Sequence, residues 1–153
     1  MLETAKQICK RAHAGQVDKG GKDYHLHPFA VADMCDTVDQ KIVAYLHDVL
    51  EDTSVTVIDL IKQGISLEII EALIALTHKP GENYFDYIER VKVNPLAKAV
   101  KIKDLIHNSD LSRLREITPK DLSRVEKYKS CIEILQTALL KAPRRVLASF
   151  FIT

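Results

Sequence analysis

The spacing of the apolar residues is the feature that most constrains the fold. They recur every three to four positions along almost the whole chain, which places them on one face of an α-helix. The alternation of apolar and polar residues that is typical of half-buried strands is nearly absent. Five glycines and five prolines interrupt the pattern, and they fall between the periodic segments. We therefore expect an all-α helical bundle, and a length of 153 residues predicts one domain, residues 1–153.

Capping residues, glycines and prolines give the expected helix boundaries. We expect helices over residues 2–13, 28–38, 39–52, 56–62, 67–78, 84–93, 95–109 and 119–141. The helix over 119–141 would pack on the others. A tail over 142–153 follows and ends in apolar residues, which would suit folding back or a homodimer contact.

Composition excludes several classes of function. A net charge of +1 gives no global field that would attract nucleic acid or an anionic membrane. No apolar run reaches the length of a membrane span, and the first residues lack the pattern of a signal peptide. Three widely spaced cysteines without a C-x-x-C motif argue against a disulfide framework or a zinc ribbon. We expect a cytoplasmic protein with no nucleic-acid or membrane partner.

Residues 43–52 carry an unusual concentration of acid. On a helix that turns about 100° per residue, one face is apolar and the other carries His47, Asp48, Glu51 and Asp52. The three carboxylates within two turns repel one another unless a cation or water separates them, and the imidazole beside them can bind the same cation. A solvated acidic face is the simpler interpretation, and this segment alone does not decide between the two.

Two further polar residues stand out on other predicted helices. His27 precedes Pro28 at the expected start of a helix, where a cap or surface role is the alternative to a ligand. Asp104 has Ala97 and Val100 on its own helix face, so it needs a partner, and an ion pair with Lys101 is the simpler choice. Together with His47 and Asp48, these residues suit Mn²⁺, Fe²⁺, Co²⁺ or Zn²⁺.

The H…HD…D pattern resembles the HD-domain metal-dependent phosphohydrolases. Residues about 4–114 resemble, more closely, the hydrolase domain of RelA/SpoT-type proteins and the small alarmone hydrolases. The motifs that carry this resemblance are His13-Ala14-Gly15-Gln16, Lys19-x-Gly21, Tyr24-x-x-His27-Pro28, Leu46 to Thr53, Leu76-Thr77, Asn83-Tyr84 and Val100 to Asn108.

The resemblance implies a metal-dependent hydrolase of the 3′-pyrophosphate of guanosine tetraphosphate or pentaphosphate. It makes His27, His47, Asp48 and Asp104 the ligands of one divalent ion, for which Mn²⁺ is our first expectation. It makes Glu51 and Asp52 the acidic pair that orients the attacking water, and Asn108 a ribose or phosphate contact. We also expect Lys19, Tyr24 and Tyr84 at the phosphorylated nucleotide, with Lys22 near its pyrophosphate.

The sequence departs from this family at two positions of the glycine-rich loop over 15–24. Asp18 stands where an arginine that helps hold the guanine nucleotide is typical, and Asp23 replaces a proline. A carboxylate cannot replace guanidinium geometry, so two alternatives stay open. One is a phosphohydrolase for another nucleotide or phosphate ester, and the other is a non-catalytic helical binding module.

Other features of the chain do not decide between these functions. We expect no synthetase or regulatory domain within these 153 residues. His13 and His78 have no sequence partner that assigns them a role. For His107 we favour a structural hydrogen bond.

Overall fold

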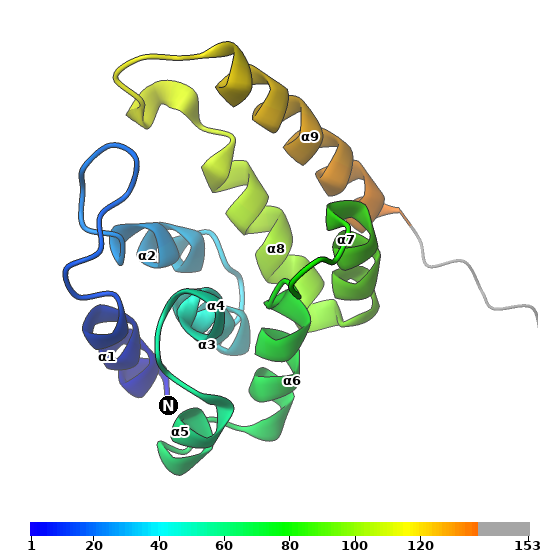
Figure 1. Cartoon of the computed structure of the whole chain (residues 1–153). Helices are drawn as coiled ribbons and strands as arrows, with labels where there is room; N and C mark the ends of the chain where they lie inside the picture. The colour runs from blue at the N-terminus through cyan, green and yellow to red at the C-terminus, as the bar shows by residue number, and fades with distance from the viewer. Residues whose placement is uncertain (138–153) are drawn as a thin grey trace, which may run out of the picture.

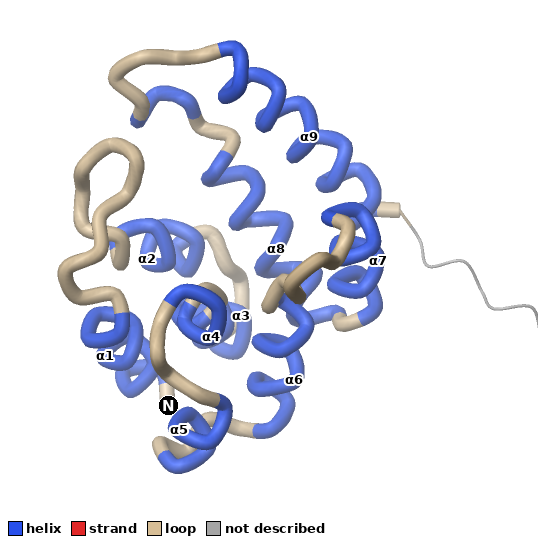
Figure 2. Tube along the Cα trace, in the orientation of Figure 1, coloured by secondary structure: helices blue, strands red, loops and turns tan. Residues whose placement is uncertain are grey.

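The computed structural model describes residues 1–137, and within them it is built from helices without a strand (Figures 1 and 2). The elements are α1 (Leu2–Ala12), α2 (Leu26–Asp33), α3 (Val38–Leu46), α4 (Val49–Asp52), α5 (Val57–Lys62), α6 (Leu67–Leu76), α7 (Tyr84–Val93), α8 (Pro95–Asn108), the 3₁₀ turn η1 (Leu111–Arg113) and α9 (Pro119–Gln136). The all-α prediction is confirmed. The tail over 142–153, with its expected homodimer contact, and the last residues of the predicted 119–141 helix lie outside the described residues.

Side-chain caps explain several of these boundaries. Thr56 and Thr118 begin α5 and α9 with capping boxes. Each threonine hydroxyl accepts from the backbone N–H of the aspartate three residues on, and the threonine's own N–H donates to that aspartate's carboxylate. Asn94 accepts from the Ala97 N–H and starts α8 at Pro95, as expected. Ser66 occupies the expected N-cap position of α6, but its side chain makes no capping hydrogen bond.

Two predicted helices had wrong bounds, and both affect the site. The second helix begins at Leu26 instead of Pro28, so His27 lies inside its first turn. This is allowed because the N–H that proline lacks would have no partner in the first turn anyway. The same helix ends at Asp33 because Thr37 caps α3 by accepting from the Gln40 N–H. The predicted 39–52 helix is divided in two: α3 ends at Leu46, and α4 begins at Val49.

The core is organised around α3, which packs against α1, α2, α6 and α8. In Figure 1 it lies in the middle of the bundle with these helices around it. All five residues from Ile42 to Leu46 are buried, so the second half of α3 is enclosed on every side. Its sequence pattern predicted burial of one face only. The end of α3 therefore delivers His47 into the interior of the protein.

The longer helix α8 runs alongside α3 and α9 and faces the core with four residues. Three are apolar: Ala97, Val100 and Leu105; the fourth is Asp104. An ionisable residue in such a row is expensive unless it has partners. Within residues 1–137, no helix has both the length and the apolar character needed to cross a bilayer.

Candidate metal centre and adjoining cavities

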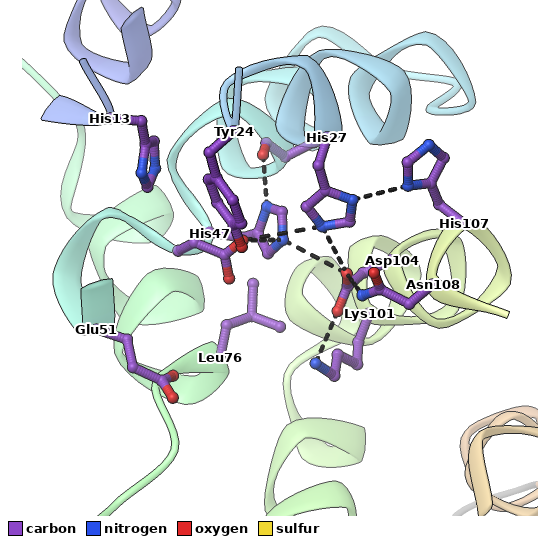
Figure 3. A network of polar contacts seen from close by, with 12 residues as sticks. His13, Tyr24, His27, His47, Glu51, Leu76, Lys101, Asp104, His107 and Asn108 are labelled. Atoms are coloured by element: carbon purple, nitrogen blue, oxygen red, sulfur yellow. Dashed lines mark hydrogen bonds and ion pairs between the residues drawn. The ribbon is translucent and has the colours of Figure 1, made fainter. Parts of the chain in front are cut away.

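Three buried side chains from three different helical segments converge on one point. His27 comes from the first turn of α2, His47 caps α3, and Asp104 lies on α8. One ligand atom from each lies within 4.8 Å of the others. In Figure 3 the three side chains point toward one another. This group can hold a metal ion, and it includes three of the four predicted ligands.

The shortest approaches in the cluster are between rings and carboxylate. His27 Nε2 lies 3.0 Å from Asp104 Oδ1, and His47 Nε2 lies 3.6 Å from the same oxygen. The side chains of His27, His47 and Asp104 are only 5%, 3% and 5% exposed. A lone surface imidazole, the alternative for His27, is therefore excluded.

Hydrogen bonds behind the rings hold Nε2 of each histidine toward the cluster. His47 Nδ1–H donates to the Ala44 carbonyl at 2.7 Å, which leaves Nε2 of a neutral ring with its lone pair directed inward. That atom is buried and has no hydrogen-bond partner in good geometry. His27 Nδ1 bonds His107 Nδ1 at 2.7 Å, the structural hydrogen bond that we expected from His107. Metal-binding imidazoles have this arrangement, because the distal nitrogen sets the tautomer of the ligating one.

The two oxygens of Asp104 have separate partners. Oδ1 faces the histidines and also accepts from Asn108 Nδ2 at 2.7 Å, while Oδ2 pairs with Lys101 Nζ at 2.7 Å. The ion pair with Lys101 thus exists together with the cluster and does not replace it. Asn108, expected at a ribose or phosphate, uses its amide to orient Asp104 in this structure.

Asp48 lies beside the cluster, at the turn between α3 and α4. His47 and Asp48 both keep right-handed helical backbone angles (φ −60°, ψ −31° and φ −99°, ψ −5°), so the helical path is interrupted only locally here. Asp48 Oδ2 lies 3.0 Å from His47 Nε2 and 3.8 Å from His27 Nε2. The Tyr24 hydroxyl donates to the same oxygen at 2.8 Å.

The charges of the cluster compensate one another in part. Burial disfavours the ionised form of Asp104, but Lys101 and then the two histidines outweigh it and hold the carboxyl pKa well below its usual range. Burial likewise opposes ionisation of Asp48, and His47 nevertheless lowers its pKa to about 2. For His47 itself, burial disfavours the imidazolium, yet Asp48 and Asp104 raise its pKa well above the ordinary value. The cluster therefore attracts positive charge.

Two cavities meet at the cluster. The cluster cavity has a volume of about 200 Å³ and is lined by His27, His47, Asp48 and Asp104 together with Glu51, Tyr84 and Lys101, among others. The loop cavity has a volume of about 300 Å³ and is lined by Asp18 and Lys19 from the α1–α2 loop and by Arg124 from α9. Tyr24, His27, Asn108 and Tyr128 line both.

The predicted site residues divide between these cavities. Glu51 and Tyr84 line the cluster cavity, Lys19 the loop cavity, and Tyr24 and Asn108 both. Asp52 lines neither; its backbone carbonyl accepts from Gln16 Nε2 at 3.0 Å. Burial, then Asp48 and Glu51, raise the pKa of its carboxyl. The predicted acidic pair is therefore separated, with Glu51 alone on the cavity wall.

Asp18 shapes its own loop. Its Oδ1 accepts from the backbone N–H groups of Gly20 at 2.8 Å and Lys22 at 3.0 Å. The loop closes as a narrow ribbon through an isolated bridge between Val17 and Asp23, visible between α1 and α2 in Figure 1. Gly21 takes a positive φ of 79° in its turn, which a side chain would oppose.

Sequence reasoning missed the contribution of α9. Arg124 and Tyr128 line the loop cavity from a helix that lies beyond the region of family resemblance, residues 4–114. Tyr128 recurs at the same helical spacing as the apolar residues of α9, which is typical of a core residue. No local signal distinguishes such a residue, because only the packing of α9 beside α7 and α8 brings it to the cavity.

Known proteins resemble this chain in sequence and in fold. No family model matches it. A probable GTP pyrophosphokinase of Mycobacterium leprae is 23% identical over 148 residues. This match covers 88% of the chain but only 18% of the length of that protein.

A solved structure gives the comparison of folds. It is a metazoan orthologue of SpoT that hydrolyses ppGpp, superposed with a TM-score of 0.72 at 18% identity. The superposition covers 88% of this chain and 85% of the other. The chain thus has the fold of a SpoT orthologue, and its resemblance to RelA/SpoT-type proteins, which its motifs predict, holds in three dimensions.

Proposed function

We propose that this protein is a metal-dependent phosphohydrolase that removes the 3′-pyrophosphate of guanosine tetraphosphate or pentaphosphate. The observation that carries the proposal is the convergence of His27, His47 and Asp104 on one point beside a polar cavity. The likeness to a ppGpp-hydrolysing SpoT orthologue supports the choice of substrate. We treat residues 1–153 as one catalytic domain and keep the cytoplasm as its expected location.

In this proposal His27, His47, Asp48 and Asp104 hold one divalent ion, with Mn²⁺ preferred. The unpartnered, buried Nε2 of His47 fits such an ion, since a lone pair directed into a carboxylate-rich cavity calls for a cation. When bound, the ion supplies a Lewis acid that polarises a phosphoryl oxygen and lowers the pKa of water. Lys101 and Asn108 orient Asp104, and His107 orients His27.

Glu51 would act as the general base. It lines the cluster cavity together with the three converging side chains, and Figure 3 shows it apart from them. Proton transfer to such a carboxylate contributes about 10²–10⁴ in rate. Asp52, which lines neither cavity, would act through charge and through its contact with Gln16 rather than on the substrate.

The nucleotide would lie across both cavities. Lys19 would pair with phosphate oxygens from the loop, and Tyr24, Tyr84 and Asn108 would contact the ribose and phosphates. With Lys101 and a divalent ion, the charge of the cluster cavity is balanced: three carboxylates, Asp48, Glu51 and Asp104, face three positive charges. An anionic substrate would then enter without net repulsion, which ties its binding to metal loading.

The second candidate is a phosphohydrolase for another nucleotide or phosphate ester, and Asp18 is the observation that favours it. The Asp18 carboxylate lines the cavity where the related hydrolases typically place an arginine. A binding module without catalysis is a third candidate, and the Glu51 carboxylate beside the cluster argues against it.

One experiment separates the three candidates. The purified protein is analysed for bound metal, loaded with Mn²⁺, and assayed for pyrophosphate or phosphate release from a panel of nucleotides and phosphate esters. We expect release of pyrophosphate from guanosine tetraphosphate. Turnover of another compound alone would select the second candidate, and no turnover by metal-loaded protein would select the third.

A further inference from the structure

The turn between α6 and α7, residues 77–83, is held by the guanidinium of Arg90. Arginine has five N–H donors, and all five are used. Nε donates to Glu82 Oε1 at 2.9 Å, and Nη2 donates to Glu82 Oε2 and to the Thr77 carbonyl, both at 2.9 Å. Nη1 donates to the carbonyls of Ala75 at 2.9 Å and Ile74 at 3.4 Å.

These contacts give Arg90 two roles: it caps the end of α6, and it holds the two sides of the turn together. The last carbonyls of a helix have no partner within it, and Arg90 supplies donors to those at the end of α6. Its two-point pair with Glu82 then ties the far side of the turn to the same group. The hydrogen bonds from Arg90 hold the pKa of the Glu82 carboxyl at about 2, so the pair is ionised at neutral pH.

The clamped turn reaches the proposed general base through His78. The His78 backbone N–H donates to Glu51 Oε2 at 3.1 Å. The ring of the same residue is tied back to the turn, because its Nε2–H donates to the Glu82 carbonyl at 2.8 Å. Glu82 thus binds Arg90 with its side chain and His78 with its backbone, and His78 binds Glu51.

We propose that Arg90 is a positioning residue for Glu51: it holds the 77–83 turn so that the His78 N–H fixes the Glu51 carboxylate at the cavity wall. The inference rests on the proposed function only for the role of Glu51. The α4 helix that carries Glu51 has four residues, and its exposed glutamate side chain has several rotamers available. Hydrogen bonding from the turn selects among them.

The expected effect on turnover is large for a residue that lines neither cavity. Misplacing a reacting group by about 1 Å costs on the order of 10²-fold in rate. We expect Arg90→Met to lower kcat by about 10- to 100-fold, while KM and bound Mn²⁺ stay close to those of the parent. Arg90→Lys should recover part of the loss, because an ammonium can pair with Glu82 but cannot span the α6 carbonyls as well.

A kinetic cycle with Glu51→Gln distinguishes positioning from a general structural effect. If Arg90 acts through Glu51, then Arg90→Met should lower kcat further by less than about twofold once Glu51 is already glutamine. Equal losses in both backgrounds would overturn the proposal. Arg11→Met, which removes an exposed guanidinium bonded to Gln7 and Gln63, is the matched control and should leave kcat unchanged.

An NMR measurement tests the same contacts from Arg90 through His78 to Glu51, and it does not depend on turnover. The backbone amide of His78 is followed by ¹H–¹⁵N NMR in folded samples. Glu51→Gln, Arg90→Met and Arg90→Lys should each shift it, and Arg11→Met should not. An unmoved His78 amide in both folded Arg90 variants would refute the proposal even if turnover falls. A shifted amide in a protein that hydrolyses no substrate would retain the clamp and refute the proposed function instead.

Discussion

The three-residue cluster and the α1–α2 loop face adjoining cavities, but they are built in opposite ways. His27, His47 and Asp104 are 5% exposed or less and come from three helical segments that pack around the core. The loop is largely exposed and is held by its own backbone and by Asp18. The cluster depends on the packing of the whole bundle, whereas the loop depends mainly on itself. Substitutions in the cluster should therefore disturb the bundle around it, whereas substitutions in the loop should act locally.

Tyr24 joins the two regions. It ends the loop, and its hydroxyl donates to Asp48 beside the cluster. Burial, then the charge of Asp48, raises the pKa of the Tyr24 hydroxyl, so it stays protonated and remains a donor. Movements of the loop are therefore linked to the carboxylate that we propose as the fourth ligand.

Removing a residue of the cluster should have the largest effect. We expect His47→Ala to weaken Mn²⁺ binding by more than about 100-fold, since loss of an outer hydrogen bond alone costs 10- to 100-fold, and to abolish pyrophosphate release. Metal analysis and a turnover assay measure both. His25→Ala, whose ring packs on Phe29, is the control. Retention of metal by His47→Ala would place the ion elsewhere.

A residue behind the cluster should have a smaller effect. His107→Ala removes the 2.7 Å hydrogen bond to His27, which frees the ring to rotate. We expect Mn²⁺ affinity to fall by about 10- to 100-fold, as measured by calorimetric titration. Unchanged affinity would mean that helix packing alone orients His27. The cluster would then depend on the bundle even more than the comparison with the loop suggests.

In the loop the expected effect is on substrate binding. Lys19→Ala removes a cation at the loop cavity, and a charged hydrogen bond is worth about 1.5–3 kcal/mol. We expect KM to rise about tenfold or more with kcat nearly unchanged. Lys22→Ala, from the same loop but outside both cavities, should change KM less. A large fall in kcat for Lys19→Ala would contradict the division between the two regions.

The smallest effect should be on thermal stability at low pH, when the ion pair between Glu82 and Arg90 in the 77–83 turn is removed. Pairing with Arg90 lowers the pKa of Glu82 from 4.5 to about 2. Its contribution is therefore complete above about pH 4.5 and disappears as the pH falls toward 2. Glu82→Gln should lower Tm by a few degrees near neutral pH, and the difference from the parent should shrink below pH 4.5.

The comparison of melting curves has a simple control. Glu126→Gln removes an exposed ion pair with Lys129 and should change Tm little at any pH. A difference between the parent and Glu82→Gln that persists undiminished to pH 3 would show that the carboxylate charge is not what the pair contributes.

Much of the fold could be read from local signals. The starts at Pro95 and at Thr118-Pro119 were predicted correctly, because a proline or a capping side chain acts within three residues of itself. The break between α3 and α4 could not be read in this way. An apolar run followed by acids fits one helix, and no residue type in it marks the turn at His47 and Asp48.

The sequence by itself determined the helical class, most helix boundaries and the identity of the residues that now surround the cluster. Those properties follow from spacing, capping and side-chain chemistry, which act over a few residues. The tertiary structure decided which residues meet: Asp104 with Lys101 and both histidines, Glu51 without Asp52 at the cavity, and Arg124 and Tyr128 opposite the loop. These contacts depend on how α3, α8 and α9 pack. They join residues that are far apart in the sequence, and no local sequence pattern predicts such contacts.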